Sequence, residues 1–499
     1  MLITSLLLAA TIDPVLAHYD KHESKHLVPM VAEVIRFSTH EHDREAHAAQ
    51  KAWLLKVAAD MKFVARDAGK VTEIELPGPA GAPVLGLVIH GDVQPAEPSA
   101  WSFAPFEGRV ENGYVLGRGA ADDKGPLIQA LLAMKALAES GVARTHTIRL
   151  LVGSEEESSA TEMKEYLETH KAPDYSLVLD SEFPVVVGEK AWDGLALVTP
   201  LTPRGESDKP YDVVELAAGL APSIVPDRAE VTLRWKGTGV NWTQFGSELQ
   251  QVKMPEGTRL AFRSDGQTYR IVVYGKSAHS GVNLGGGRNA LVALAHALDG
   301  KLPPGGANDL LAFARLAGQD LHGTGLGITD RDPLWGSYGV NVATIKPLPA
   351  DATKNVLYIN LRRIPPRTGA QMKAHLAAVV DAFNKRTGAA LTVDEKLSYF
   401  DDEPLGFDPN SKIVKRLMAA YSRATGTKNP KPAISGGGTY AKRLPNAIAF
   451  GMWFPGKPYP GHDVDEKISV DDLQRGTRVL IHALVDLATG PPLEGAFAP

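Results

Sequence analysis

The sequence has no cysteine at any of its 499 positions. This absence excludes disulfide bonds, thiolate zinc sites and a cysteine nucleophile. The sequence also lacks a run of 18 apolar residues, so no transmembrane helix is expected. It has no excess of positive charge, because 53 Lys and Arg against 58 Asp and Glu give a formal net charge of −5. Such a balance argues against a partner that is nucleic acid or an anionic membrane. Any bound metal must therefore be held by His, Asp and Glu.

The remaining composition is that of a globular enzyme. Hydrophobic residues make up 44% and charged residues 22% of the chain, and its length predicts two or three domains. The 48 Gly and 35 Pro indicate many turns. The apolar segment 6–10 resembles the hydrophobic part of a signal peptide, but no Lys or Arg precedes it and no clean cleavage site follows. Localisation therefore stays open between the cytoplasm and export to the periplasm.

Apolar strands alternate with amphipathic helices along the chain, which predicts an α/β fold with a mostly parallel sheet flanked by helices. In the first part we expect strands at 84–89, 148–152 and 177–179, and helices at 13–37, 44–68 and 127–138. A polar segment with Pro and Gly at 199–209 predicts a linker to a second domain. We expect a catalytic domain made of residues 1–198 and 401–499, with an inserted α+β lid domain of residues 199–400.

Histidine and carboxylate residues follow several of these strands. His90 comes directly after an apolar strand, and Asp92 could accept a hydrogen bond from one of its ring nitrogens, leaving the other for a metal. Taken singly, a turn histidine beside a solvated aspartate explains this pair as well. The same holds for the other candidates, which are Asp122 and Asp123 at a glycine-flanked helix start, the acidic run 155–157, Asp180 after its strand, and His462 in a late loop.

Together these residues indicate a metal site. Carboxylate oxygens and imidazole nitrogens suit zinc, manganese or cobalt. Two metals that share one carboxylate can bind a water between them, acidify it, and hold both oxygens of a hydrolytic transition state. A nearby Glu that binds no metal would then accept the proton. No Gly-x-Ser-x-Gly elbow, phosphate-binding loop or dinucleotide fingerprint is evident.

The chain resembles the co-catalytic zinc metallopeptidases that include dipeptidase V, carnosinase and aminoacylase, and the dipeptidase V branch most. The resemblance is carried in order by the motifs His90-Gly91-Asp92-Val93, 117–126, the acidic run, 179–184, 277–281, and 436–440 followed by His462. It implies two zinc ions per chain and a cis peptide bond between Asp122 and Asp123.

The resemblance also implies a role for each residue of the metal site. Asp122 is the ligand shared by both ions, His90 and Asp180 complete one site, and Glu157 and His462 complete the other. Glu156 is the general base, and Asp92 is the partner of His90. The register of the acidic run stays open, because a shift to Glu155 as base and Glu156 as ligand fits the motif too.

Two further roles fall in the inserted domain. His279, in Ser277-Ala278-His279-Ser280-Gly281, is expected to stabilise the oxyanion of the transition state. Arg362 is expected to bind the substrate carboxylate through its planar fork, although Arg363 beside it could face the substrate instead. An inserted domain of this length resembles the dipeptidase V arrangement, which implies a functional monomer.

The expected activity is metal-dependent hydrolysis of a short peptide, above all a dipeptide, by a di-zinc-bound hydroxide with Glu156 as base. Two alternatives remain. The same site could deacylate N-acyl amino acids, or the protein could be a metal-free binding or scaffold relative.

Overall fold

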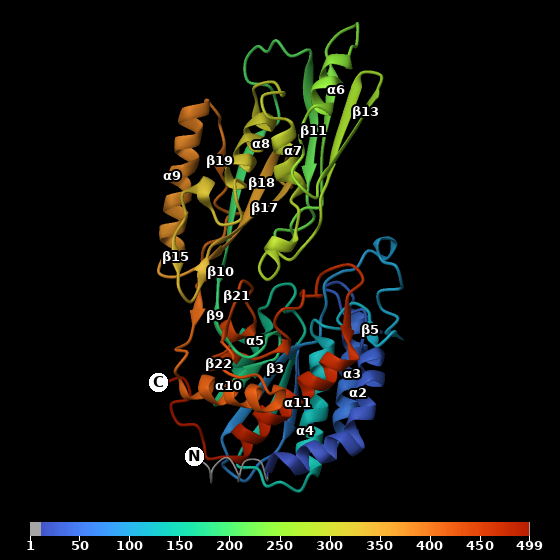
Figure 1. The fold of residues 1–499 in the computed structure, drawn as a ribbon, viewed down its shortest axis with the longest axis vertical. Coiled ribbons are helices and arrows are strands. Elements are labelled where there is room, and N and C mark those ends of the chain that lie inside the picture. The colour runs from blue at the N-terminus through green and yellow to red at the C-terminus, as the bar shows by residue number, and fades with distance from the viewer. Residues whose placement is uncertain (1–10, 499) are drawn as a thin grey trace. The chain divides into compact units, whose positions relative to one another are not determined.

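The computed structural model describes residues 11–498, which form two compact units (Figure 1). Unit 1 contains the described residues up to Glu189 and those from Leu405 onward, and unit 2 is Lys190–Pro404. The signal-like segment 6–10 lies outside the described residues. In the part of the chain that is described, no helix is both long and apolar enough to cross a membrane.

Unit 1 contains a six-stranded sheet with the order β1 (Val64–Ala68), β2 (Val71–Leu76), β6 (Thr147–Gly153), β3 (Val84–His90), β7 (Tyr175–Val178) and β22 (Ala447–Ala449). The four strands β6, β3, β7 and β22 are parallel, whereas β1 and β2 add an antiparallel hairpin beside β6. The predicted α/β fold is confirmed, with this hairpin as an addition.

The two faces of the unit 1 sheet contact different cores. Leu85, Leu87 and Ile89 of β3 belong to a large core that includes residues of α4 and α11, while Val88 points into a smaller core with Met163 of α5. Such alternation is what a strand covered on both faces requires. Besides the helical residues 11–18, the described part of unit 1 contains η1 (Tyr19–Glu23), α2 (Ser24–Val34), α3 (Arg44–Asp60), η2 (Pro98–Ala100), α4 (Lys124–Glu139), α5 (Glu162–Thr169), α10 (Lys412–Thr425), η5 (Tyr440–Lys442) and α11 (Val470–Thr489).

Short strands complete unit 1 in three small sheets. They are β24 (Lys467–Ser469) with β5 (Tyr114–Leu116) and β4 (Arg109–Glu111), β20 (Leu405–Gly406) with β9 (Val186–Glu189) and β21 (Ala433–Ser435), and β23 (Met452–Trp453) with β8 (Ser181–Glu182).

Two predicted helices of unit 1 differ in the structure. The helix expected at 13–37 contains a π-helical turn, η1, which lies between the α-helical residues 11–18 and the helix α2. The helix expected at 44–68 was too long, since α3 ends at Asp60 and β1 begins at Val64. Gly69 has φ +79° in the tight turn that pairs β1 with β2, a conformation that favours glycine. The apolar residues of this segment have helical spacing, but the pairing of β1 with β2 determines its structure.

Unit 2 is built on one antiparallel sheet of eight strands. Its order is β13 (Arg259–Asp265), β14 (Thr268–Tyr274), β12 (Arg228–Trp235), β11 (Tyr211–Ala218), β17 (Gly339–Leu348), β18 (Asp351–Arg363), β10 (Ala191–Pro200) and β19 (Thr392–Val393). The sequence placed the first domain border after residue 198, but β10 belongs to this sheet. The change in composition at 199 therefore marks the end of a strand rather than a border between the units.

The helices of unit 2 share a core with one face of its sheet. Leu357, Ile359 and Leu361 of β18 point into this core, which also contains residues of α7, α8 and α9. The remaining elements are α6 (Thr243–Gln250), η3 (Leu284–Gly286), α7 (Ala290–Ala297), α8 (Gly306–Ala317), η4 (Thr324–Leu326), β15 (Arg331–Asp332), β16 (Gly336–Ser337) and α9 (Gly369–Thr387).

Candidate metal centre

The predicted metal ligands gather at one edge of the unit 1 sheet. His90 is the last residue of β3 and pairs in register with Gly153, the last residue of β6, after which the acidic run begins. Asp180 follows β7, which is parallel to β3 on its other side. The carboxyl ends of parallel strands meet at the same edge, so loops that are distant in sequence become neighbours there.

Asp122 approaches His90 and Asp180 in a first group. Its Oδ1 lies 2.9 Å from Nε2 of His90, and that nitrogen lies 3.9 Å from Oδ2 of Asp180. One ligand atom from each residue lies within 4.8 Å of the others. Ligand atoms held tetrahedrally at about 2.0–2.2 Å from a zinc ion are roughly 3.4 Å apart, so this spacing fits one ion.

A second group uses the other oxygen of Asp122. Nε2 of His462 lies 3.1 Å from Asp122 Oδ2 and 2.9 Å from Glu157 Oε1. These three residues also offer ligand atoms within 4.8 Å of one another. Asp122 is therefore common to both groups, with one oxygen toward each. Its peptide bond to Asp123 is cis, as the resemblance implied.

Asp92 contacts both the acidic run and the ring of His90. Its carboxylate accepts the main-chain N–H groups of Glu156 and Glu157, at 3.2 and 2.9 Å. Nδ1 of His90 lies 3.0 Å from the main-chain carbonyl oxygen of Asp92 and 3.6 Å from its carboxylate. Nδ1 of His90 therefore faces both the carbonyl and the carboxylate of Asp92, so the role of Asp92 as the partner of His90 stays a prediction.

The three residues of the acidic run have different surroundings. Glu155 is paired with Lys70 at 3.0 Å. Glu157 receives a hydrogen bond from Nε2 of Gln94 on Oε2, at 3.0 Å, which leaves Oε1 directed at His462. Glu156 is between them and pairs with neither Lys70 nor Gln94. This geometry favours the register with Glu157 in the ligand group and Glu156 as the remaining carboxylate.

The carboxylates create a strongly negative field at this edge. Burial disfavours a charged imidazole, yet the hydrogen bond to Asp122 holds the pKa of His90 well above its usual value. Burial and the nearby Glu157 raise the pKa of Glu156 to about 8, although His90 opposes the shift. Burial and the neighbouring Asp122 also raise the pKa of Asp180. The site therefore favours a positive charge at its centre, which is what a divalent cation supplies.

Two residues that contact Asp122 were not identified from the sequence. The Tyr459 hydroxyl donates a hydrogen bond to Asp122 Oδ2. Glu466, which is buried, accepts the N–H of Asp122 at 3.2 Å and is paired with Arg118 at 2.7 Å. Tyr459 precedes His462 and Glu466 follows it, so their position beside this motif was the only sign of their role in the sequence. They fix Asp122 from its side chain and from its main chain.

His279 belongs to unit 2 and is held by its own loop. Its Nδ1 accepts the N–H groups of Gly281 and Val282, both at 3.1 Å. The ring proton of the neutral imidazole is therefore on Nε2, which makes that atom a donor. The next residue, Ser280, accepts a hydrogen bond from Nη2 of Arg362 at 3.1 Å, so the two predicted unit 2 residues belong to one local network.

The two neighbouring arginines at the end of β18 point to opposite faces of the sheet. Arg363 has the parity of Leu361 and is fully buried, with hydrogen bonds to Asp193 and Glu403. Arg362 has the parity of Asn360 on the other face, and its Nε has no hydrogen-bond partner among the described residues. Burial lowers the pKa of Arg362 to about 10, so it stays charged at neutral pH. Of the two, Arg362 has donors left for a ligand.

Comparison with known proteins assigns the chain to a family. The model of peptidase family M20/M25/M40 matches residues 86–486. YtjP of Bacillus subtilis (strain 168) is 28% identical over 409 residues, which cover 82% of this chain and 84% of YtjP. The Beta-Ala-Xaa dipeptidase of Lactobacillus delbrueckii subsp. lactis is 28% identical over 417 residues, covering 82% and 83%.

A solved structure agrees with the fold. The structure of the di-peptidase Dug1p from Saccharomyces cerevisiae has a TM-score of 0.60 at 13% identity, covering 95% of this chain and 98% of Dug1p. At this identity the likeness concerns the fold alone. Since the family model spans most of the sequence, the chain belongs to peptidase family M20/M25/M40 and is a hydrolase of peptide bonds.

Proposed function

We propose that this peptidase is a zinc-dependent dipeptidase. The observation that supports the proposal most directly is the position of Asp122, whose two carboxylate oxygens face the His90 group and the His462 group respectively. A carboxylate with one oxygen toward each group can bind two metal ions that lie side by side.

The chemistry of the five side chains fits two zinc ions, with manganese or cobalt as further options. Two imidazole nitrogens and three carboxylates form a mixed nitrogen and oxygen donor set, and thiolates are absent from the chain. His90 and Asp180 would hold one ion, Glu157 and His462 the other, and Asp122 both. When bound, the pair supplies a Lewis acid that polarises the scissile carbonyl and acidifies a water.

The protein residues then move one proton and stabilise charge. Glu156, the carboxylate left outside both groups, accepts the proton of the attacking water and passes it to the leaving amine. A base for this task must lie within reach of the attacking water, and Glu156 is adjacent to Glu157 in the acidic run. His279, with its proton on Nε2, is proposed to donate a hydrogen bond to the oxyanion.

Dipeptide selectivity is proposed to depend on unit 2. Arg362 is charged at neutral pH, and its Nε has no hydrogen-bond partner among the described residues. A guanidinium group matches the planar geometry of a carboxylate. A group that binds the free carboxyl end limits the length of the peptide that can follow the scissile bond. The similarity to a Beta-Ala-Xaa dipeptidase supports this substrate class. We further propose that unit 2 acts as a lid and that one chain is a complete enzyme.

A panel of substrates with and without chelator tests the proposal. Free dipeptides should be hydrolysed, longer peptides slowly, and activity should vanish with chelator and return with zinc. Cleavage of N-acetyl amino acids alone would overturn the dipeptidase assignment in favour of a deacylase. Less than about one equivalent of metal after mild purification, with no hydrolysis of either class, would favour a metal-free binding protein.

A further inference from the structure

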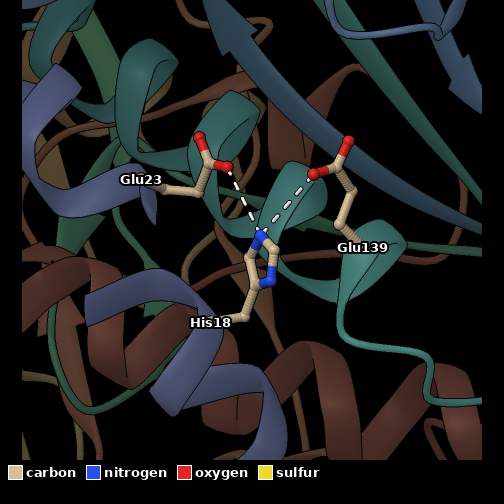
Figure 2. Close-up of side chains that lie close together, drawn as sticks. All are labelled: His18, Glu23 and Glu139. Carbon is tan, nitrogen blue, oxygen red and sulfur yellow. Dashed lines mark ion pairs between the residues drawn. The ribbon is translucent and has the colours of Figure 1, made fainter. Parts of the chain in front are cut away.

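A second cluster of metal-ligating side chains lies in unit 1, away from the sheet edge that carries Asp122. It consists of His18, Glu23 and Glu139, each of which offers one ligand atom within 4.8 Å of the others. Figure 2 shows the ring of His18 pointing between the two carboxylates, with Nε2 toward both. Its distances are 3.5 Å to Glu23 Oε1 and 3.7 Å to Glu139 Oε2.

The π-helical turn brings two of these residues to one face. In an α-helix, residues five apart differ in direction by about 140°, so His18 and Glu23 would point to different sides. The turn η1 covers Tyr19–Glu23 and closes i to i+5 contacts, which aligns the two side chains. Glu139 is the last residue of α4, and the negative end of the helix dipole at this position favours a bound cation.

The spacing within the cluster differs from that of a simple ion pair. A protonated imidazole normally donates to a carboxylate at about 2.7–2.9 Å. Here Nε2 of His18 is buried and has no hydrogen-bond partner among the described residues. Its distances of 3.5 and 3.7 Å instead match ligand atoms arranged around one cation, which are roughly 3.4 Å apart.

The charges and exposure allow a cation to enter. The side chains of His18 and Glu23 are 17% and 10% exposed, whereas that of Glu139 is 41% exposed and opens the cluster to solvent. Lys135 hydrogen bonds to Oε1 of Glu139, which leaves Oε2 on the side of His18. One nitrogen and two carboxylates, completed by water, form a donor set for zinc, manganese or cobalt.

We propose that His18, Glu23 and Glu139 form a structural site for a divalent cation of the zinc class. A cation bound there fastens the π-helical turn to the end of α4, the helix whose other end follows Asp122 and Asp123. The site is separate from the proposed catalytic centre and does not depend on its activity.

Metal counting on the full-length chain tests the site. The chain is stripped with chelator, titrated with Zn²⁺, and the bound metal is measured. Glu139→Gln and His18→Asn should each bind one equivalent less than the wild type, while His26→Asn, at an exposed histidine of α2, should bind the full number. Equal zinc binding by the wild type, Glu139→Gln and His18→Asn would overturn the proposal, as would the same loss in His26→Asn.

A second measurement isolates the cluster from the catalytic ligands. A chain with Asp122→Ala lacks the shared ligand, yet it should still bind one equivalent of Zn²⁺ and gain thermal stability from it. Adding Glu139→Gln to this chain should remove both the bound zinc and the gain in thermal stability. Because Glu139 is partly exposed, the change should leave the helix content measured by circular dichroism unaltered. Zinc-induced stabilisation that persists without Glu139 would contradict the site.

Discussion

Arg363 binds Asp193 through two hydrogen bonds, from Nε to Oδ2 at 2.8 Å and from Nη2 to Oδ1 at 3.3 Å. Both side chains are fully buried. Arg363 is therefore committed to the interior of unit 2, and only its neighbour Arg362 keeps donors for a substrate. The two arginines, which the sequence could not distinguish, should respond differently to substitution.

Replacing Arg362 by Lys should impair recognition of the substrate carboxylate. A hydrogen bond to a charged group contributes about 1.5–3 kcal/mol, so kcat/KM for free dipeptides should fall roughly tenfold to a hundredfold, mainly through KM. Dipeptide amides lack the carboxylate and serve as the control, because their kcat/KM should change little. An equal loss on both substrates would remove Arg362 from this role.

Replacing Arg363 by Met should instead destabilise unit 2. The change leaves the Asp193 carboxylate buried without its partner, which costs about 3–5 kcal/mol of unfolding free energy. Urea unfolding measures the loss, and Arg263→Met, at an exposed position of β13, is the control. Asp193→Asn combined with Arg363→Met should recover part of the stability. Unchanged stability in Arg363→Met would show that the pair is not structural.

Replacing Glu156 by Gln should abolish turnover while the metal remains bound. Loss of a general base lowers kcat by about 10²–10⁴-fold, whereas Glu156 belongs to neither ligand group. Steady-state kinetics and metal analysis on the same sample measure both quantities. Glu155→Gln, which affects the contacts with Lys70 and Ser159 and leaves Lys70 paired with Glu165, should retain activity. If Glu155→Gln lost turnover and Glu156→Gln retained it, Glu155 would be the base and the alternative register of the acidic run would hold.

Replacing Gly461 by Ala should disturb the shared carboxylate. A Cβ atom there would lie 2.4 Å from Tyr459 Oη and 2.8 Å from Asp122 Oδ2, closer than real contacts allow. Zinc affinity and kcat/KM should both fall by at least about tenfold, since a ligand must move. Gly285→Ala adds a Cβ with no atom within 4 Å and should behave as the wild type. Normal metal binding by Gly461→Ala would mean that Asp122 accommodates the added Cβ atom without a loss of zinc affinity.

The sequence predicts the parts of the site that follow from strand ends. His90 and Asp180 come directly after apolar strands, and parallel strands bring such positions together. Asp122 was identified as well, because glycines on both sides of a helix start mark a backbone with a special conformation. Local pattern and sheet topology thus identify these positions as candidates, whereas their roles as ligands were implied by the family resemblance.

Other contacts depend on packing between distant segments and carry no local signal. Tyr459 reaches Asp122 across more than 300 positions of the chain, and Glu466 does the same. The strand β1 looked helical by its apolar spacing, because only its pairing with β2 identifies it as a strand. The cluster of His18 depends on a π-helical turn, and the sequence predicts an ordinary helix there.

His482 on α11 should make the stability of the protein depend on acidity. Its Nδ1 is buried with no hydrogen-bond partner in the described chain, and burial, together with the nearby Arg423, lowers its pKa to about 4. In the unfolded chain a histidine has a pKa near 6.5. Between these values the unfolded state binds a proton that the folded state does not, so stability is fully present above pH 6.5 and falls as the pH approaches 4.

The contribution of His482 amounts to ~2–3 kcal/mol across this range and is removed in His482→Gln. Unfolding free energies measured from pH 7 to 4 should therefore fall less steeply for this variant than for the wild type. His42→Gln is the matched control, because the side chain of His42 is 84% exposed and its replacement should leave the slope unchanged. Parallel curves for the wild type and His482→Gln would show that His482 takes up its proton equally in both states.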